Sequence, residues 1–512
     1  MPEGKNSCEV CRKAAKQFCS SCKAVFYCSK ECQKRGWKEH KNNCRCFSIQ
    51  VHPKYGRLLI ATRDIKAGEV LLKESPLLVG PKEKSSAIVC LGCHRAARDY
   101  RCIRCHYPLC GPQCQTAKYH KDECEVLSRV EVPPEFNGAS QSALSHVTVL
   151  RVLLTQKFDH KTWQLISDMQ DHFAEIKRGD LYRYFMTNVV DFLMKVVHYE
   201  EADEATILRV CGILMTNSFE VKHNGSRVRG LYHTASKMAH SCVANTKHVF
   251  EDDLTGVFIA TQPITKGTPI TVNYSQVLWN TMARRQHLKM LKFFLCECPR
   301  CCDATELGTH FSTLLCDECG SSVVSRNPLD LDAPWSCSKC PHVISAKQVR
   351  WGDAVLYKEL RELDKSSPRA LENFLEKYKK TLHSQHRFFV EAKYGLVKLY
   401  GNSPNCRFRD MSRTQLENKV NWSRSLLDLS AVLDPGLSLL RGSLLFELQA
   451  GIVALAKHLL SNDIITTEGA KDYMKEAAEV LQEATAILNH EPDMRDGGLN
   501  ERLSYIAQEL EI

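Results

Sequence analysis

Residues 236–250 read SKMAHSCVANTKHVF, and in this stretch the triplet His-Ser-Cys stands between two alanines, Ala239 and Ala244. About thirty residues later the chain reads ITVNYS, which places Tyr274 at the end of a β-rich segment. Histidine, cysteine and tyrosine are side chains that bind metals or act in catalysis. Whether they form a working pocket here depends on what the rest of the chain places around them.

Length and composition predict a multidomain protein. The chain has 512 residues, more than one hydrophobic core usually organises. Its hydrophobic content of 44% and charged content of 25% are typical of globular proteins. The start, MPEGKNSCEV, lacks the apolar segment of a signal peptide, and there is no apolar run of about eighteen residues. We therefore expect an intracellular protein, in the nucleus, the cytoplasm or both, without a membrane span.

The cysteines indicate bound metal. The chain has 26 of them and no secretion signal, so a disulfide framework is not expected, and most occur in C-x-x-C or C-x-x-x-C pairs. The formal net charge is +10, but about six zinc ions held by 22 thiolates would contribute about ten negative charges and cancel it. Net charge therefore does not support direct binding to nucleic acid.

Two arrays of eight metal ligands repeat the same order along the chain. The short cysteine pairs suit tetrahedral zinc, and the pairs spaced four residues apart face one side of a helix. We expect an interleaved pairing, in which the first, second, fifth and sixth ligands hold one ion and the other four hold the second. The first array comprises Cys8, Cys11, Cys19, Cys22, Cys28, Cys32, His40 and Cys44, and the second comprises Cys90, Cys93, Cys102, Cys105, Cys110, Cys114, His120 and Cys124.

Two further zinc sites are predicted after Tyr274. The motif CECPRC supplies three cysteines, which need a fourth ligand from elsewhere, and CDEC with CSKC supplies four, which complete a site by themselves. The ligands are Cys296, Cys298 and Cys301 in the first of these sites and Cys316, Cys319, Cys337 and Cys340 in the second.

The end of the first array resembles a known family. Residues 26–44 read FYCSKECQKRGWKEHKNNC, which is closely similar to the MYND zinc finger. MYND fingers are protein-binding modules that dock short proline-containing peptides. The resemblance implies such peptides as partners, whereas the ligand spacing by itself does not.

Residues 55–80, between the two arrays, read YGRLLIATRDIKAGEVLLKESPLLVG. Two β-rich segments flank Ala67-Gly68, and this pattern predicts a hairpin. Together with GLYHTASKMAHSCVAN, GVFIATQPITKGTPITVNYS and FFLCECPRC, the stretch resembles a SET domain that is split by a MYND insertion. This is the SMYD architecture, and the resemblance runs from about Tyr55 to Cys301. The extra finger at the start makes the chain most similar to the arthropod-type SMYD proteins.

The resemblance implies a protein-lysine methyltransferase that uses S-adenosylmethionine, with histones among the possible substrates. It places Tyr274 on the catalytic tyrosine and Cys242 on the fourth ligand of the CECPRC zinc site. That zinc ion would hold the segment carrying the adenine-stacking phenylalanine over the donor. The implied donor-binding residues are Gly56, Arg57, Asn217, His240 and Phe294.

Three departures from the family pattern weaken the implied pocket. Ala239 replaces an asparagine that hydrogen-bonds the donor, and the loss of one such bond costs about 1–3 kcal/mol. Leu58 replaces the second glycine of the donor loop, and it would add about 1–2 kcal/mol of strain if that position needs a left-handed backbone. Lys292 stands where the family often has a channel tyrosine, and it would repel a substrate lysine, although Phe293 is a possible substitute for the tyrosine.

The expected fold class is α+β: a split SET domain with small β-sheets, an inserted MYND finger, an extra N-terminal MYND finger, post-SET zinc sites and an α-helical, TPR-like C-terminal domain. Whether that last domain is a helical cap or a peptide-binding groove stays open. The expected boundaries are 1–46 for the first finger, 47–89 for the N-terminal part of SET, 90–124 for the second finger, 125–214 for a helical insertion, 215–290 for the SET core, 291–345 for the post-SET and four-cysteine sites, and 346–512 for the helical domain.

Two functions remain in competition. The first is the lysine methyltransferase, for which the matched tyrosine, donor-binding residues and pocket-side zinc ligands all occur together. The second is a catalytically weak or inactive zinc adaptor that recruits proline-containing peptides. Binding of the methyl donor would discriminate between them.

Overall fold

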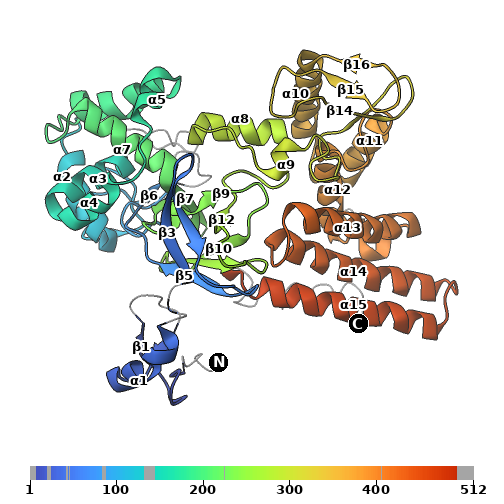
Figure 1. The fold of residues 1–512 in the computed structure, drawn as a ribbon, viewed down its shortest axis with the longest axis horizontal. Helices are drawn as coiled ribbons and strands as arrows, with labels where there is room; N and C mark the ends of the chain where they lie inside the picture. The colour runs from blue at the N-terminus through green and yellow to red at the C-terminus, as the bar shows by residue number, and fades with distance from the viewer. Residues whose placement is uncertain are drawn as a thin grey trace.

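Small antiparallel sheets and helices alternate along the chain in the computed structural model (Figure 1). The strands between residues 47 and 272 form the middle of the molecule, and helices flank them on both sides. The structure describes residues 7–19, 25–41, 44, 46–82, 88–97, 99–131, 144–223, 225–404 and 406–492.

The N-terminal finger is a small β-hairpin followed by one helix. Its elements are β1 (Gln17–Phe18), β2 (Phe26–Tyr27) and α1 (Lys30–His40). Helix α1 starts after Ser29, whose side chain accepts a hydrogen bond from the backbone N–H of Cys32 and so satisfies a free donor of the first turn. The helix carries a cysteine near its start and a histidine at its end, so it positions ligands of two different zinc ions.

The SET region consists of four short sheets. Antiparallel pairing gives the orders β3-β4, β10-β11-β5 and β6-β8-β7, whereas β9 and β12 pair in parallel. Aliphatic and aromatic side chains between these sheets form a common core. The strands are β3 (Phe47–His52), β4 (Gly56–Ala61), β5 (Val70–Glu74), β6 (Leu78–Pro81), β7 (Ser218–His223), β8 (Ser226–Leu231), β9 (Ala239–His240), β10 (Thr246–Phe250), β11 (Gly256–Ala260) and β12 (Thr271–Val272).

The hairpin predicted at Ala67-Gly68 is wrong. Gly68 does occupy a turn with φ of +82°, but strand β4 before it pairs with β3, and β5 after it pairs with β11. The turn is held by the N–H of Gly68, which donates to the carbonyl of Ala260 at 2.8 Å. The local turn signal was correct, and partners distant in sequence decided which strands pair.

The inserted finger and the helices after it share one hydrophobic core. Helix α3 runs through the middle of this core, and ten of its residues from Ser145 to Leu154 are buried. The elements are the one-turn 3-10 helix η1 (Pro112–Cys114), α2 (Lys118–Leu127), α3 (Ser145–Phe158), α4 (His160–Ser167), α5 (Phe173–Arg178), α6 (Leu181–Phe185), the π-helical segments η3 (Met186–Val190) and η4 (Phe192–Val196), and α7 (Glu204–Asn217).

Two helices and a small four-stranded sheet follow the SET core. The sheet has the order β13-β14-β15-β16 and carries the four-cysteine motif at its strand ends and turns. The elements are α8 (Thr281–Lys292), α9 (Pro299–Cys302), β13 (Leu314–Leu315), β14 (Ser322–Ser325), β15 (Trp335–Cys337) and β16 (Val343–Ile344).

The C-terminal region is helical, as expected, and has its own large core. Helix α14 has an apolar composition and the length needed to cross a membrane, but 78% of its most apolar window is buried inside the protein, between α13 and α15. We therefore assign it as the core helix of this domain. The helices are α10 (Ala346–Glu362), α11 (Pro368–Tyr378), α12 (Arg387–Leu399), α13 (Arg413–Leu433), α14 (Leu439–Ser461) and α15 (Thr467–Leu488), with a short hairpin of β17 (Asn402–Ser403) and β18 (Cys406–Arg407) between α12 and α13.

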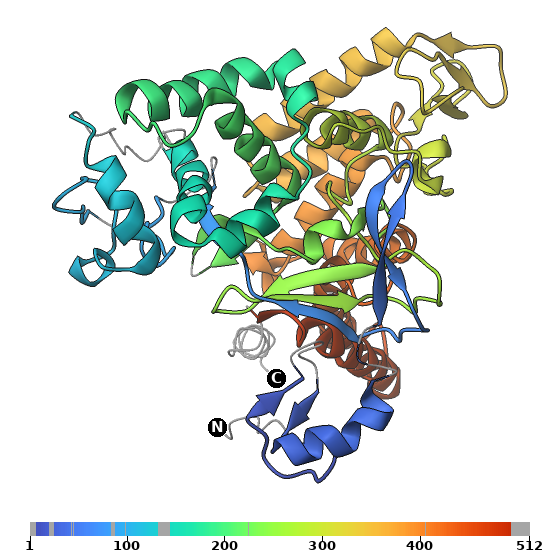
Figure 2. The ribbon, with the colours of Figure 1, turned by 60° about the vertical axis from the view of Figure 1, so that its left-hand side comes forward.

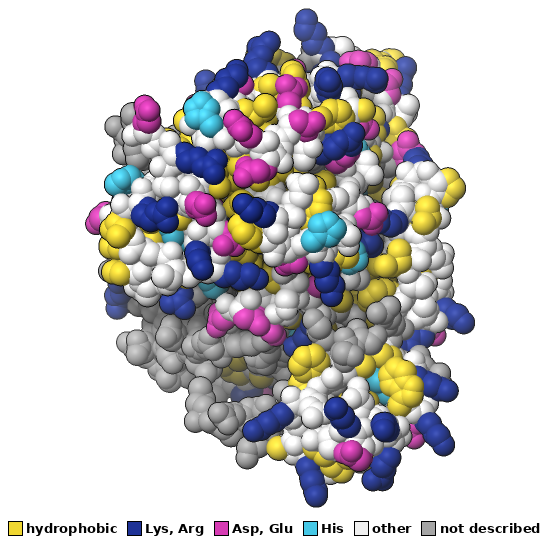
Figure 3. Space-filling model, turned by 90° about the vertical axis from the view of Figure 1, so that its left-hand side faces the viewer, with side chains coloured by type: hydrophobic (Ala, Val, Ile, Leu, Met, Phe, Trp, Pro, Cys, Tyr) yellow, Lys and Arg dark blue, Asp and Glu magenta, His cyan; other side chains and the backbone are white. Residues whose placement is uncertain are grey.

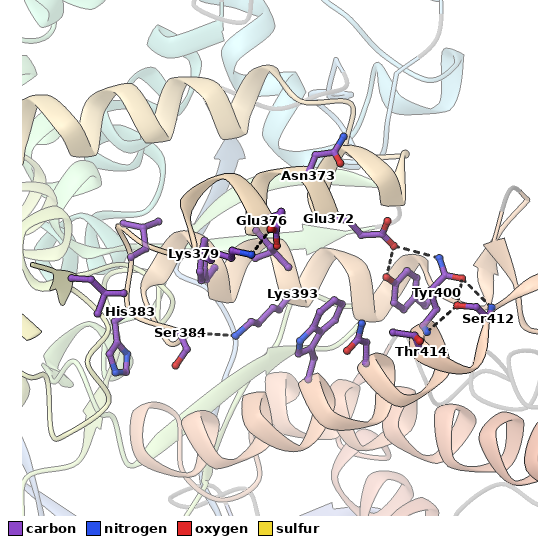
Figure 4. Close-up of a pocket in the computed structure, with 17 residues that line it drawn as sticks. Glu372, Asn373, Glu376, Lys379, His383, Ser384, Lys393, Tyr400, Ser412 and Thr414 are labelled. Atoms are coloured by element: carbon purple, nitrogen blue, oxygen red, sulfur yellow. Dashed lines mark hydrogen bonds and ion pairs between the residues drawn. The ribbon is translucent and has the colours of Figure 1, made fainter. Parts of the chain in front are cut away.

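A cavity of about 900 Å³ opens among α11, α12 and α13 (Figure 4). Its lining is mixed: Trp422 and Phe389 are apolar, whereas Lys393 donates to the carbonyl of Ser384 at 2.6 Å. The helical domain therefore offers a hollow surface as well as a packed core, which leaves the groove interpretation open.

Candidate active site

Tyr274 lies two residues after the end of β12, and both its backbone and its side chain are hydrogen-bonded. Its backbone N–H donates to Nδ1 of His240 at 3.0 Å, and its hydroxyl donates to the carbonyl of Met238. Burial raises the pKa of this hydroxyl above its usual range. The tyrosine therefore stays protonated near neutral pH, so it can orient reactants by hydrogen bonding but is no base.

His240 connects this tyrosine to a metal site. Its Nδ1 accepts the bond from Tyr274, so the ring proton lies on Nε2, which is 3.3 Å from Sγ of Cys242. Burial lowers the pKa of His240 to about 4, which keeps the imidazole neutral. Since both ring nitrogens are used inside the protein, a methyl donor would meet the ring face or the backbone of His240.

The zinc cluster beside His240 combines four cysteines from two distant parts of the sequence. Cys242 lies 3.6 Å from Cys301 and 3.9 Å from Cys296, measured between sulfur atoms, and Cys298 completes the group. The predicted fourth ligand is therefore brought to the CECPRC motif. The ring of Phe294 lies 5.8 Å from that of His240, so the metal site, the histidine and the predicted adenine-stacking residue are neighbours.

Arg284 supports this cluster, and the sequence contained no signal for it. Its Nε donates to Sγ of Cys242 at 3.2 Å, and its guanidinium is paired with Glu306 at 2.7 Å in a fully buried position. Such a contact to a ligand sulfur fixes the ligand and stabilises its thiolate form. Arg284 reaches Cys242 only because α8 packs against the His-Ser-Cys segment, and this packing has no local motif.

The other cysteines also gather in groups whose geometry fits zinc. A zinc ion with Zn–S bonds of about 2.3 Å places tetrahedral sulfurs about 3.8 Å apart. The observed sulfur separations include 3.4 Å for Cys11–Cys28 and 3.6 Å for Cys102–Cys124, well beyond a disulfide bond. Four further groups are complete within the described residues: Cys8, Cys11, Cys28 and Cys32; Cys90, Cys93, Cys110 and Cys114; Cys102, Cys105, His120 and Cys124; and Cys316, Cys319, Cys337 and Cys340.

These groups have the interleaved pairing that the spacing predicted. The remaining predicted site combines Cys19, His40 and Cys44 with Cys22, and Cys22 lies outside the described residues. Within this site, the sulfur atoms of Cys19 and Cys44 are 3.5 Å apart. The described residues therefore bring together complete ligand sets for five zinc ions and part of the set for a sixth.

The donor side of the site starts at β4. Gly56 has φ of +67°, a left-handed conformation that glycine adopts without strain, and Arg57 forms an ion pair with Asp168 between α4 and α5. The strain expected at Leu58 is absent: this residue is in regular strand pairing with Gln50, and its backbone is not left-handed. The conditional penalty of about 1–2 kcal/mol at this position therefore does not apply.

Asn217 ends α7 on the same side. Its amide nitrogen donates to the carbonyls of Gln170 and Ile213 at 2.9 and 2.8 Å, which leaves its Oδ1 as an acceptor facing away from them. Three buried polar atoms next to the predicted site residues have no hydrogen-bond partner among the described residues: Thr216 Oγ1, Ser218 Oγ and Asn273 Nδ2. Unused polar groups of this kind fit a site for a polar ligand such as S-adenosylmethionine.

Lys292, at the end of α8, faces Tyr274. Its Nζ lies 5.4 Å from the centroid of the tyrosine ring. Phe293 does not take the place of a channel tyrosine, because its ring packs 4.8 Å from that of His172 in the helical insertion. The reason is the left-handed backbone of Phe293, with φ of 58°, which turns the chain at the end of α8.

Ala239 is half-buried in β9, where it pairs with Thr271 of β12. The methyl side chain of this alanine offers no hydrogen bond. The site therefore retains the tyrosine, the histidine, the aromatic ring and the metal cluster, but it lacks one polar group at the position expected to contact the donor.

Comparison with known proteins identifies a MYND finger and a SET domain in the chain. The model of the MYND finger matches residues 8–44, and that of the SET domain matches residues 56–275. Over an alignment of 363 residues, the chain is 30% identical to the SET domain-containing protein SmydA-8, isoform B, of Drosophila melanogaster. This alignment covers 67% of this chain and 78% of that protein. The chain belongs to the SMYD family.

Other relatives of this SMYD chain carry the names of methyltransferases. It is 29% identical over 268 residues to histone-lysine N-methyltransferase ASHR1 of Arabidopsis thaliana, covering 50% of this chain and 55% of the relative. It is 24% identical over 261 residues to human histone-lysine N-methyltransferase SMYD3, covering 48% and 59% respectively. These two relatives are thus named as histone-lysine methyltransferases.

Proposed function

We propose that the protein is an S-adenosylmethionine-dependent protein-lysine methyltransferase. When bound, S-adenosylmethionine supplies an electrophilic methyl group on a positively charged sulfur. The residues of this chain have three tasks: to orient the donor, to exclude water from the acceptor amine, and to hold the two groups in line. Because the ordinary pKa of a lysine is about 10.4, an apolar channel that favours the neutral amine is part of the chemistry.

One observation supports the proposal most strongly, namely the chain of contacts from Tyr274 through His240 to Cys242. The half-buried His240 fixes the backbone of the tyrosine on one side and a metal-ligand sulfur on the other. A metal ion at this cluster would therefore control the position of the tyrosine as well as that of Phe294. Preorganisation of this kind is what a methyl-transfer site needs, since its residues act by position rather than by covalent chemistry.

The competing proposal is an adaptor with a closed donor pocket. Ala239 favours it, because the missing hydrogen bond weakens donor binding by about 1–3 kcal/mol. The cavity among α11, α12 and α13 favours it as well, because an adaptor needs a surface for a peptide. We prefer the enzyme, since the absence of strain at Leu58 removes one of the two expected penalties on donor binding.

Calorimetric titration with S-adenosylmethionine tests the choice. We expect the wild-type protein to bind the donor at tens of micromolar or more weakly, and Ala239→Asn to bind it about 5- to 150-fold more tightly, as one recovered hydrogen bond predicts. Tyr274→Phe should leave donor affinity nearly unchanged and suppress methylation of a lysine-peptide library, because its hydroxyl acts on the reacting groups.

The outcomes separate the two functions. No binding by either the wild type or Ala239→Asn at millimolar donor would show that the pocket is closed, and the adaptor would then be the function. Binding by both, with methylation that depends on Tyr274, supports the enzyme. Thermal unfolding of each variant controls for loss of fold.

The partners proposed with this function are lysine-containing proteins at the active site and proline-containing peptides at the MYND fingers. Direct nucleic-acid binding is not part of the proposal. On the upper part of the face that Figure 3 shows, cationic and anionic side chains are interspersed, whereas cationic side chains predominate on the small lobe at the lower right. The proposed location is inside the cell, in the nucleus or cytoplasm, because zinc thiolates need a reducing environment.

A further inference from the structure

The ammonium group of Lys292 is held beside Tyr274 by the end of another helix. Its Nζ donates to the carbonyl of Thr216 at 2.6 Å and to that of Met215 at 3.0 Å, both in the last turn of α7. It also lies over the face of the Tyr274 ring. The end of α7 and the tyrosine thus enclose the ammonium between them.

The surroundings favour a cation by dipoles and a π face. The C-terminal carbonyls of a helix carry partial negative charge, and the face of an aromatic ring attracts an ammonium group. Burial and the charge of Arg229 in β8 act in the opposite direction and lower the pKa of Lys292 to about 8. The other titratable neighbours are Tyr274 itself, His240 in β9 and His287 in α8, and burial lowers the pKa of both histidines. Near neutral pH, Lys292 is therefore mostly charged and its histidine neighbours are neutral.

We propose that Lys292 is an internal occupant of the acceptor channel, whose ammonium group takes the place beside Tyr274 that the amine of a substrate lysine needs. The inference rests on the proposed function, since it assumes that Tyr274 marks the reacting centre. Two amines do not fit over one tyrosine face, so a substrate lysine enters only after Lys292 leaves the α7 carbonyls. Lys292 is thus a specificity-determining residue that opposes entry of a charged lysine.

The same cation affects the donor, and this provides a test that needs no known substrate. S-adenosylmethionine carries a positive charge on its sulfur, whereas S-adenosylhomocysteine, which lacks the methyl group, does not. A fixed ammonium group near the reacting methyl repels the sulfonium charge of S-adenosylmethionine, whereas the uncharged sulfur of S-adenosylhomocysteine is not repelled. The ratio of the two affinities therefore reports the charge at position 292, while contacts to adenine and ribose cancel.

The experiment is a calorimetric titration of both ligands into the full-length wild type, Lys292→Gln and Lys292→Arg. Glutamine keeps N–H donors for the α7 carbonyls but has no charge, whereas arginine keeps both donors and charge. We expect the preference for S-adenosylhomocysteine to fall about tenfold in Lys292→Gln and to stay within about threefold of the wild type in Lys292→Arg. If Lys292→Gln does not fold, Lys292→Met replaces it as the variant without a charge at position 292.

A second readout is methylation of a lysine-peptide array, which should rise at least about tenfold in Lys292→Gln. An unchanged ligand ratio and unchanged methylation in a folded, zinc-loaded Lys292→Gln would show that Lys292 only caps α7, and the inference would be overturned. If neither ligand binds to any of these variants, the proposed function itself fails, and the inference fails with it. Ligand binding with an unchanged ratio thus contradicts the inference alone.

Titration provides a further check of the same assignment. Because the folded pKa of Lys292 is about 8, its positive charge is present below that pH and is lost as the pH rises through it. The preference for S-adenosylhomocysteine should therefore decrease between about pH 7 and pH 9 in the wild type and stay constant in Lys292→Gln. A pH-independent ratio in the wild type would contradict the placement of this charge near the donor.

Discussion

The two zinc fingers have the same ligand order, but the structure gives them different surroundings. The N-terminal finger has a small core made mostly of its own ligands, with Ala15 and Tyr27. The inserted finger instead contributes Leu91, Tyr107 and Leu109 to the core of the helical insertion. Figures 1 and 2 both draw the first finger apart from the body of the molecule, joined ahead of β3. Equal metal chemistry therefore does not mean equal structural importance.

A buried ion pair shows how the inserted finger is joined to the body. Arg151 of α3 forms two hydrogen bonds with the carboxylate of Glu123, at 2.6 and 2.8 Å, and a third with the carbonyl of Leu91 at 2.5 Å. Glu123 lies 3.6 Å from Nδ1 of the ligand His120. The metal site, the finger and the helical insertion are thus connected through one arginine, and α3 also packs against β6 of the SET core.

Removal of zinc should have the largest effect, and the two fingers should lose their zinc ions at different rates. We expect about six zinc ions per chain and loss of the fold on complete chelation, since metal binding and folding are coupled. The first finger, whose Cys11, Cys28 and Cys32 are only partly buried, should release its ions before the inserted finger does. Zinc release measured with a chromogenic chelator, alongside circular dichroism, checks this order. A total of two or three ions would contradict the assignment of paired sites.

Loss of one equivalent ligand in each finger should give the next largest difference. Cys102→Ser removes a ligand that is buried in the shared core, so we expect a loss of several kcal/mol from the body and disruption of donor binding. The matched variant Cys19→Ser should unfold only the first finger and abolish peptide binding there. Thermal unfolding and donor titration measure both effects. Loss of donor binding in Cys19→Ser would show that the first finger supports the SET region.

The buried ion pair should account for part of this difference. Arg151→Met leaves the carboxylate of Glu123 buried without its partner, and this costs about 3–5 kcal/mol. In the first finger, Arg12 and Glu9 form an exposed pair at 4.0 Å, so Arg12→Met should change stability by less than about 0.5 kcal/mol. Denaturant unfolding gives both values, monitored on the body for Arg151→Met and on the first finger for Arg12→Met. Similar values for the two variants would contradict the anchoring role of Arg151.

The smallest effect is expected at the contact between Tyr107 of the inserted finger and His146 of α3. Their hydroxyl and Nε2 are 2.8 Å apart in a buried position, so Tyr107→Phe should cost about 0.5–1.5 kcal/mol. The exposed Tyr55 in the β3–β4 turn is a control, and its replacement by phenylalanine should be nearly neutral. Equal, negligible changes would indicate that packing alone joins the finger to the helices.

The sequence was most informative where short spacing decides the chemistry. Pairs of cysteines a few residues apart can meet only on one turn or one helix face, so the two fingers and the four-cysteine site followed from the motifs. Helical segments after residue 346 followed from apolar periodicity. The hairpin at Gly68 failed for the opposite reason, because β5 found its partner in β11, about 190 residues away along the chain.

What the sequence determined by itself is therefore the set of metal ligands, the SET and MYND motifs and the helical character of the C-terminal region. Only the tertiary structure decided that Leu58 is unstrained, that both ring nitrogens of His240 are used, and that Lys292 rather than Phe293 faces Tyr274. It also decided that one finger shares a core and the other does not. The physical reason is that ligand geometry is local, whereas strand pairing, side-chain direction and burial depend on elements that are far apart in the chain.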